Sequence, residues 1–187
     1  MNPSKTALLV MDIQNGIVGN FAENPEVLIP IQDSVKAARE AEIPVIFVRV
    51  AFKEGYPEVN LNNKMFSAIK ESGSMTETDW STQIHESVAP LSGEPLVTKR
   101  RVSAFAGSDL EVLLSGLGTE ELVLTGIATS GVVLSTLREA ADKDFRLKVL
   151  SDACIDRDPE VHRVLVEKVF PRQADVLTAS EWADSLK

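Results

Sequence analysis

The stretch Thr6-Ala7-Leu8-Leu9-Val10-Met11-Asp12-Ile13 decides the fold of this chain. Its central run, from Ala7 to Met11, is apolar throughout, which is typical of a strand buried on both faces of a parallel sheet. Asp12 interrupts this run where the chain is still partly shielded from water, and a carboxylate there is costly unless it is paired. The alternative interpretation of Asp12 is a turn former that caps a loop.

Outward from this strand, short apolar runs alternate with longer stretches whose apolar residues lie three and four apart, the pattern of βαβ units. We therefore predict an α/β fold: a three-layer α/β/α sandwich with a Rossmann-like, mainly parallel six-stranded sheet. The further strands are predicted at Pro44–Ala51, Leu96–Lys99, Glu121–Thr125, Arg146–Ser151 and Asp175–Thr178. Helices are predicted at Pro25–Glu42, Asp109–Ser115, Thr129–Asp142, Pro159–Val169 and Ser180–Leu186.

We expect one domain spanning residues 1–187, with a polar insertion at about 52–92 between two strands. Except around Lys64–Lys70 this insertion lacks clear periodicity, and segments of this length are usually functional. It is a candidate lid or subunit contact, and a homo-oligomer, a dimer or a tetramer, is expected.

Composition excludes several classes of function. The formal net charge of −9 repels phosphate backbones and anionic headgroups, so neither nucleic acid nor a membrane is an expected partner. The early apolar run is too short for a signal peptide, and the lone cysteine, Cys154, fits a reducing cytoplasm. His85 and His162 are isolated, and no glycine-rich phosphate loop follows a strand, so no metal or cofactor is expected.

Ligands of open parallel sheets bind beyond the carboxyl ends of the strands. Three segments qualify: Asp12 to Gly16, Lys99 to Arg101, and Gly126 to Val132. Lys99 is a strand-end cation that by itself fits a solvated position, but it would neutralise Asp12 if the two met. The third segment leads into a predicted helix, so its amides offer an oxyanion or carboxylate site, with Thr129 or Ser130 as the helix cap.

At these segments the sequence resembles the isochorismatase-like hydrolase superfamily, which includes nicotinamidases, carbamoylases and isochorismatases. The resemblance covers nearly the whole chain. It implies that Asp12 is the catalytic aspartate, that Lys99, followed by Ser103-Ala104-Phe105, is the catalytic lysine, and that the Ile127–Ala128 peptide is cis. The substrate contacts that follow from it are Gln14, Arg101, Ala128, Thr129 and Ser130.

The sequence departs from the amidase branches at the nucleophile. In those branches a cysteine stands six residues after the glycine that begins the turn, and the count from Gly126 reaches Val132, which has no nucleophilic atom. Ser130 is the alternative nucleophile that the turn offers, but its position, two residues too early, disfavours it. The histidines with which nicotinamidases bind metal after the second strand are missing from Val50–Lys53 and the insertion beyond it.

Isochorismatases are the branch that works without this cysteine. They protonate a vinyl ether and let water complete the reaction, so an acid is needed and a nucleophile is not. Arg101, two residues after Lys99, also resembles their lysine segment. A positive Lys99 lowers the pKa of Asp12, whereas burial and a substrate carboxylate raise it, and the sequence leaves the balance open.

Three hypotheses remain. The first is a hydrolase of a small anionic or amide-bearing metabolite, in which Asp12 is the acid or base and Lys99 its electrostatic partner, with vinyl ether hydrolysis as one option. In this hypothesis Arg101 and the amides near Ala128 and Val132 bind negative charge. The second is a relative that binds a metabolite or a partner protein without catalysis. The third and weaker is an amidase of the nicotinamidase or carbamoylase type that uses Cys154.

Overall fold

The first strand, β1 (Thr6–Met11), lies in the middle of the sheet, and all six of its residues are buried. The computed structural model describes residues 5–21 and 25–187. Strand β1 pairs in parallel with β2 (Val45–Val50) on one side and β4 (Glu121–Ile127) on the other. Burial on both faces explains why this strand has no alternating polar residues.

The remaining strands extend the sheet in both directions, and every pairing is parallel. Strand β3 (Leu96–Lys99) lies outside β2, while β5 (Arg146–Ile155) and β6 (Asp175–Leu177) follow β4, so the order is β3-β2-β1-β4-β5-β6. The chain thus reverses its direction of travel across the sheet between β1 and β4. Such a switch point opens a crevice at the carboxyl ends of the strands.

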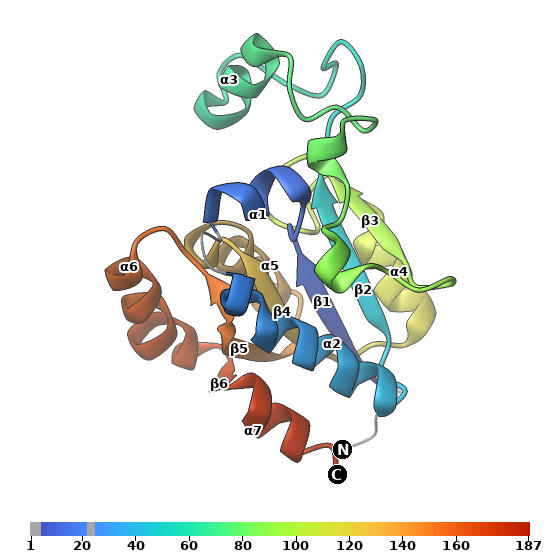
Figure 1. The fold of residues 1–187 in the computed structure, drawn as a ribbon, viewed down its shortest axis with the longest axis vertical. Coiled ribbons are helices and arrows are strands. Elements are labelled where there is room, and N and C mark those ends of the chain that lie inside the picture. Colours follow the sequence, from blue (N-terminus) through green and yellow to red (C-terminus); the bar gives the residue numbers. More distant parts are fainter. Residues whose placement is uncertain (1–4, 22–24) are drawn as a thin grey trace.

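Helices cover both faces of the sheet, which confirms the predicted three-layer fold (Figure 1). On one face, α2 (Ile29–Glu40) and α7 (Ala179–Asp184) pack through residues such as Ile31, Val35 and the fully buried Trp182. On the other face, α4 (Leu110–Leu117) and α5 (Leu134–Asp142) pack through Leu114 and Leu137. The remaining helical segments along the body are α1 (Asn15–Phe21), η2 (Pro25–Leu28), η5 (Thr129–Val133), α6 (Pro159–Val164), η6 (Leu165–Val169) and η7 (Phe170–Arg172).

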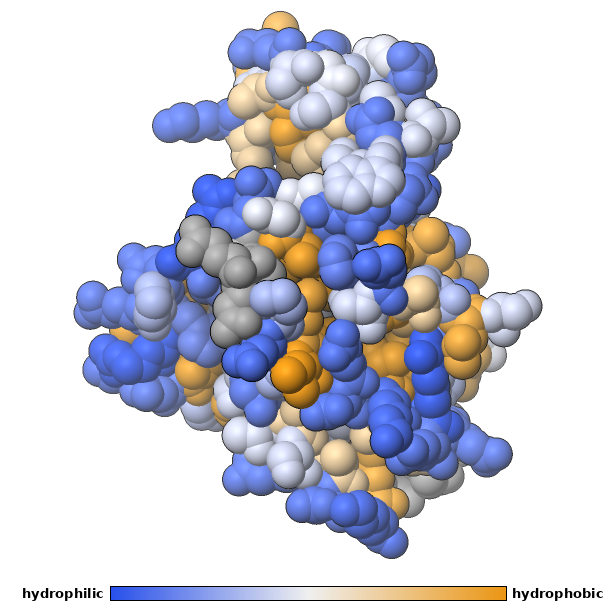
Figure 2. Space-filling model, in the orientation of Figure 1, coloured by the Kyte–Doolittle hydropathy of each residue, from blue (hydrophilic) through white to orange (hydrophobic). Residues whose placement is uncertain are grey.

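The polar insertion forms an arm beyond the carboxyl edge of the sheet, where Figure 1 shows α3 standing apart from the body. The arm contains α3 (Lys64–Ser72), η3 (Trp80–Thr82) and η4 (Glu86–Val88). A small apolar cluster joins the arm to the end of β2 and is formed by Val50, Phe52, Tyr56, Val59 and Phe66. Most of the face seen in Figure 2 is hydrophilic, and apolar side chains appear in patches between the polar ones.

The structure differs from the sequence prediction at the ends of some elements and within one predicted helix. Strand β1 ends at Met11 and not at Ile13, because Asp12 takes a left-handed conformation with φ 58°. Helix α1 was not predicted. The helix predicted at 129–142 is divided, since Gly131 has non-helical angles between η5 and α5. None of the helices in residues 5–21 and 25–187 is long and apolar enough to cross a membrane.

Gly126 lets strands β1 and β4 meet at the switch point. It pairs with Met11, has φ 147°, and a Cβ at this position would lie 2.3 Å from the Met11 carbonyl oxygen. Neither the angle nor the distance admits an L side chain.

We expect Gly126→Ala to lower the free energy of unfolding by about 2 kcal/mol or more, because the new methyl group displaces the backbone of β1. Gly116→Ala is the matched control, since Gly116 lies in α4 and a methyl group added there would meet nothing within 4 Å. This control should stabilise the protein by about 0.5–1 kcal/mol. Urea denaturation measures both, and equal effects would contradict the role of Gly126.

Candidate functional site

The carboxylate of Asp12 and the ammonium of Lys99 form a buried ion pair. Asp12 follows β1, and its backbone N–H donates to the Val48 carbonyl oxygen at 2.8 Å. Lys99 is the last residue of β3, and its Nζ lies 2.9 Å from Asp12 Oδ2. The side chains of Asp12 and Lys99 are 7% and 2% exposed, respectively. Since β2 lies between β1 and β3, the pair spans the end of the intervening strand.

Burial dominates the electrostatics of Asp12. Removal from water raises the pKa of this carboxyl, and the charge and hydrogen bond of Lys99 oppose the rise without cancelling it. Its second oxygen, Oδ1, is buried and has no hydrogen-bond partner among the described residues. Of the two opposing effects on the pKa of Asp12, burial therefore outweighs the charge of Lys99. The carboxyl holds a proton more readily than an exposed aspartate does.

The loop after β3 holds Lys99 from the other side. The ammonium donates to the Arg101 carbonyl oxygen at 3.1 Å. The Arg101 side chain turns toward the arm, where it donates to the carbonyl oxygens of Arg100 and Glu58 and lies 5.9 Å from the centre of the Phe66 ring. The guanidinium of Arg101, which was predicted to contact the substrate, therefore already has hydrogen-bond partners within the protein.

The turn after β4 lies next to Asp12, because Gly126 pairs with Met11. The Ile127–Ala128 peptide is cis, the geometry that the resemblance implies. The Ala128 carbonyl oxygen accepts from the N–H groups of Gly131 and Val133. Several amides of the predicted anion site are therefore already bonded within the turn.

Two side chains from beyond β5 brace this turn. The Ser130 N–H donates to Asp156 Oδ2 at 2.7 Å, and the Thr129 hydroxyl lies 2.8 Å from His162 Nδ1. Thr129 is fully buried. Thr129 and the Ser130 amide are therefore held by protein partners within the scaffold. The sequence did not predict these two contacts, because no short-range pattern links residues 26 or 33 positions apart.

Val132 points into the apolar core on the α4 and α5 face of the sheet, where it is 2% exposed. Its neighbours in the chain, Gly131 and Val133, belong to the same irregular turn. A buried aliphatic side chain at this place supplies packing but no lone pair or proton.

The Isochorismatase domain model matches residues 6–181 of the chain. The chain belongs to the isochorismatase family. As a member of this family it is a hydrolase.

Individual relatives support the same assignment. The chain is 32% identical to the isochorismatase family protein YwoC of Bacillus subtilis (strain 168), over 98% of this chain and 95% of YwoC. It is 31% identical to the ureidoacrylate amidohydrolase RutB of Stutzerimonas stutzeri (strain A1501), over 86% of this chain and 73% of RutB. The structure of a cysteine hydrolase from Pseudomonas syringae pv. phaseolicola 1448A shares its fold, with a TM-score of 0.90 at 22% identity over 100% of this chain and 94% of the other.

In this isochorismatase-family structure Gln14 is fully buried, and backbone groups occupy its side-chain amide. Its Nε2 donates to the carbonyl oxygens of Val50 and Thr82, and its Oε1 accepts from the Val50 N–H at 2.8 Å. The predicted substrate contact of Gln14 has no support in this geometry. Instead, Gln14 ties the segment after Asp12 to the end of β2 and to the arm.

Arg100 is a site neighbour that the sequence prediction missed. It donates to the Ala51 carbonyl oxygen and pairs with Glu58 and Glu77 of the arm. Lys53, Glu58, Arg100, Arg101 and Gly107 line a pocket of about 580 Å³ at this edge of the sheet. The sequence feature that could have identified Arg100 is the pair of consecutive arginines directly after the strand end at Lys99.

Cys154 lies on β5, where it pairs with Gly126 and is 4% exposed. Burial raises the pKa of its thiol to about 12, so the nucleophilic thiolate is scarce at neutral pH. Among the described residues no group of three or more His, Cys, Asp or Glu is placed to hold a metal ion.

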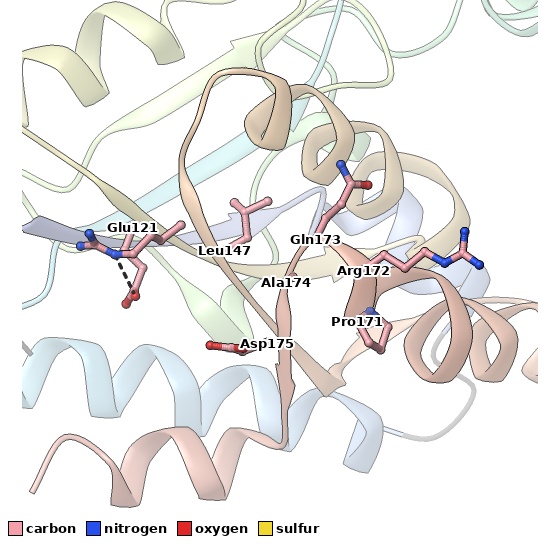
Figure 3. A pocket seen from close by; sticks show the side chains of 8 residues that line it. Glu121, Leu147, Pro171, Arg172, Gln173, Ala174 and Asp175 are labelled. Atoms are coloured by element: carbon pink, nitrogen blue, oxygen red, sulfur yellow. Dashed lines mark ion pairs between the residues drawn. The ribbon is translucent and has the colours of Figure 1, made fainter.

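A second pocket, of about 370 Å³, lies at the opposite edge of the sheet. Figure 3 shows Glu121 and Asp175, the first residues of β4 and β6, with the Asp175 carboxylate extending toward the side on which Glu121 lies and Arg172 pointing away. Glu121 pairs with Lys148 at 2.6 Å and also lies 3.7 Å from Arg146. This pocket is remote from Asp12, because the carboxyl ends of parallel strands lie at the other edge.

We expect Lys99→Met to destabilise the protein by about 3 kcal/mol at pH 8, because it leaves the Asp12 charge buried without a partner. The penalty should shrink toward pH 5. Because the pKa of Asp12 is higher in the folded than in the unfolded state, protonation of Asp12 adds to the free energy of unfolding. This stabilisation is lost as the pH rises through the pKa of the folded state. Urea denaturation across this range measures the effect.

The double variant Asp12→Asn/Lys99→Met is the control, since it removes both charges. Its stability relative to the native protein should depend on pH in the opposite sense, improving as the pH rises, because it no longer carries the buried carboxyl. A penalty for Lys99→Met that is equal at pH 5 and pH 8 would contradict the titration of Asp12.

We expect the Cys154 thiol of the folded protein to react with iodoacetamide at pH 8 about 10³-fold more slowly than the same thiol in urea, because so little of it is ionised. Mass spectrometry of the alkylated protein over time measures both rates. Rapid alkylation of the folded protein would instead identify Cys154 as an activated nucleophile.

Proposed function

We propose that this protein hydrolyses a small anionic metabolite with Asp12 as the proton-transfer group and Lys99 as its electrostatic partner, without a cysteine nucleophile. The observation that carries the proposal is the buried Asp12 carboxyl, whose raised pKa and unpartnered Oδ1 suit it to hold and deliver a proton. Val132, at the place implied for the nucleophile, supports chemistry that does not pass through a covalent enzyme intermediate.

A vinyl ether is the substrate class that best suits this arrangement. Protonated Asp12 transfers its proton to the β-carbon of the double bond, which leaves a cationic carbon stabilised by the ether oxygen. Water adds to this carbon and returns a proton to the Asp12 carboxylate. The resulting hemiketal breaks its C–O bond, its hydroxyl proton passes to the leaving oxygen, and an alcohol and a carbonyl compound are released. Lys99 stabilises the Asp12 carboxylate formed in the first step, at the 2.9 Å separation of the pair.

The substrate's negative charge would lie toward Arg101 and the amides near Ala128 and Val132. Arg101 lines a pocket at the carboxyl edge of the sheet, and its carbonyl oxygen accepts from Lys99 of the ion pair. Gln14, Thr129 and Ser130 fit better as groups that hold the site's backbone, given the partners that they already have.

An amidase reaction is the second candidate, favoured by the 31% identity to RutB, a ureidoacrylate amidohydrolase. The burial of Cys154 and the absence of a thiol at Val132 disfavour it. A relative that binds a metabolite or partner protein without turnover is the third. A cytoplasmic location stays a prediction. Assembly into a homo-oligomer also stays a prediction, and the exposed apolar side chains of Leu61 and Met65 on the arm favour it.

The test is turnover of isochorismate, a vinyl ether, and of ureidoacrylate, followed by chromatography of substrate and product. We expect the native protein to consume isochorismate, and Asp12→Asn to lower the rate by about 10²-fold or more, because an amide has no proton of suitable acidity to transfer.

Asp142→Asn is the matched control, since Asp142 is exposed at the end of α5 and should be replaceable without loss of rate. Consumption of ureidoacrylate alone would favour the amidase. Retention of either compound without turnover would favour the binding protein, and full activity of Asp12→Asn would refute the proposal.

A further inference from the structure

The loop between β3 and α4 is attached to α5 by two hydrogen bonds, one buried and one partly buried. The Ala104 N–H donates to the Thr136 hydroxyl at 2.9 Å, and both residues are fully buried. The neighbouring Ser103 hydroxyl donates to Glu139 Oε2 at 2.5 Å. Thr136 and Glu139 lie one helical turn apart on α5, so the helix holds the loop at two consecutive residues.

The same loop carries the carbonyl that holds Lys99. The Lys99 ammonium contacts Asp12 Oδ2 at 2.9 Å and the Arg101 carbonyl oxygen at 3.1 Å. Arg101 is two residues before Ser103, so a movement of the attached segment is passed directly to this carbonyl. An ammonium has three donors, and their directions follow the acceptors that surround it.

Thr136 is an unusual choice at this place if its role is only to form a helix. Threonine has a low helix propensity, because its branched side chain crowds the preceding turn and its hydroxyl competes for backbone groups. Here the hydroxyl accepts from a loop N–H that is remote in sequence and buried. Without this acceptor the Ala104 N–H would be left unsatisfied in the core, which is unfavourable unless the loop moves.

We propose that Thr136 is a positioning residue, which fixes the loop after β3 so that the Arg101 carbonyl holds the Lys99 ammonium against Asp12. This inference deepens the proposed function and rests on it for its catalytic meaning. The helix that follows the turn at Val132 thus also sets the geometry of the ion pair on the other side of β1. A single helix in this way connects the two halves of the site.

Loss of the Thr136 hydroxyl changes the electrostatics of Asp12 in a defined direction. Lys99 is the charged group that faces Asp12 among the described residues, and it opposes the rise in the pKa of Asp12 caused by burial. If the loop relaxes and the ammonium withdraws, this opposition weakens, and the pKa of Asp12 rises further.

The experiment is a ¹³C NMR titration of the Asp12 side-chain carboxyl in the native protein, Thr136→Val and Thr136→Ser, assigned with Asp12→Asn. Valine keeps the shape of threonine and removes the acceptor, whereas serine restores the hydroxyl. We expect the midpoint in Thr136→Val to rise by about half a pH unit or more, a roughly threefold change in the ratio of protonated to ionised carboxyl, and to return in Thr136→Ser.

A purely structural role predicts a different result: Thr136→Val would lower the melting temperature but leave the Asp12 midpoint unchanged, and this outcome would overturn the inference. If Thr136→Val does not fold, Ser103→Ala tests the same attachment from the loop side and should raise the midpoint in the same direction. An unchanged midpoint in folded Ser103→Ala would then count against the proposal.

The titration separates failure of this inference from failure of the proposed function. A shifted midpoint together with full turnover by Asp12→Asn would leave Thr136 as the residue that positions the ion pair and would refute the catalytic role of Asp12. An unchanged midpoint together with an inactive Asp12→Asn would refute the positioning role of Thr136 and would leave the catalytic role of Asp12 standing.

Discussion

The buried contact between Lys99 and Asp12 is the constraint on which the rest of the site depends. Two charges removed from water are stabilised only when their geometry is good and their remaining donors and acceptors are met. The 2.9 Å contact across the end of β2 requires β1 and β3 to end at matching heights. Gln14 secures one side by bonding to Val50 and Thr82, and the Arg101 carbonyl secures the other.

The parallel sheet makes this contact possible, because it brings every strand's carboxyl end to one edge. The reversal of strand order between β1 and β4 adds the turn at Gly126 to the same place. The close approach of Gly126 to Met11 has no room for a side chain. The fold therefore places a buried carboxyl with a raised pKa and an irregular turn side by side, independently of any substrate.

The sequence predicted those parts of the structure that depend on local pattern. The strand at Leu96–Lys99 was placed at its observed ends, and the placement of Asp12 and Lys99 at strand ends anticipated their meeting. It did not predict helix α1, the left-handed Asp12, or the saturation of the Gln14 amide. Hydrogen bonds to residues distant in the chain accompany each of these features, and apolar spacing carries no information about such partners.

Val132 defines what the pair can do. A thiol at this position would need a base, and Asp12 would accept its proton. With a buried valine there, the turn has no thiol proton to transfer. The lone thiol of the chain, that of Cys154, lies on β5 opposite Gly126, and burial raises its pKa to about 12, so it stays largely protonated at neutral pH. Under the proposed function, the raised pKa of Asp12 means that a larger fraction of this carboxyl carries the proton that a general acid needs. Lys99 limits the rise in pKa, so the proton can still leave.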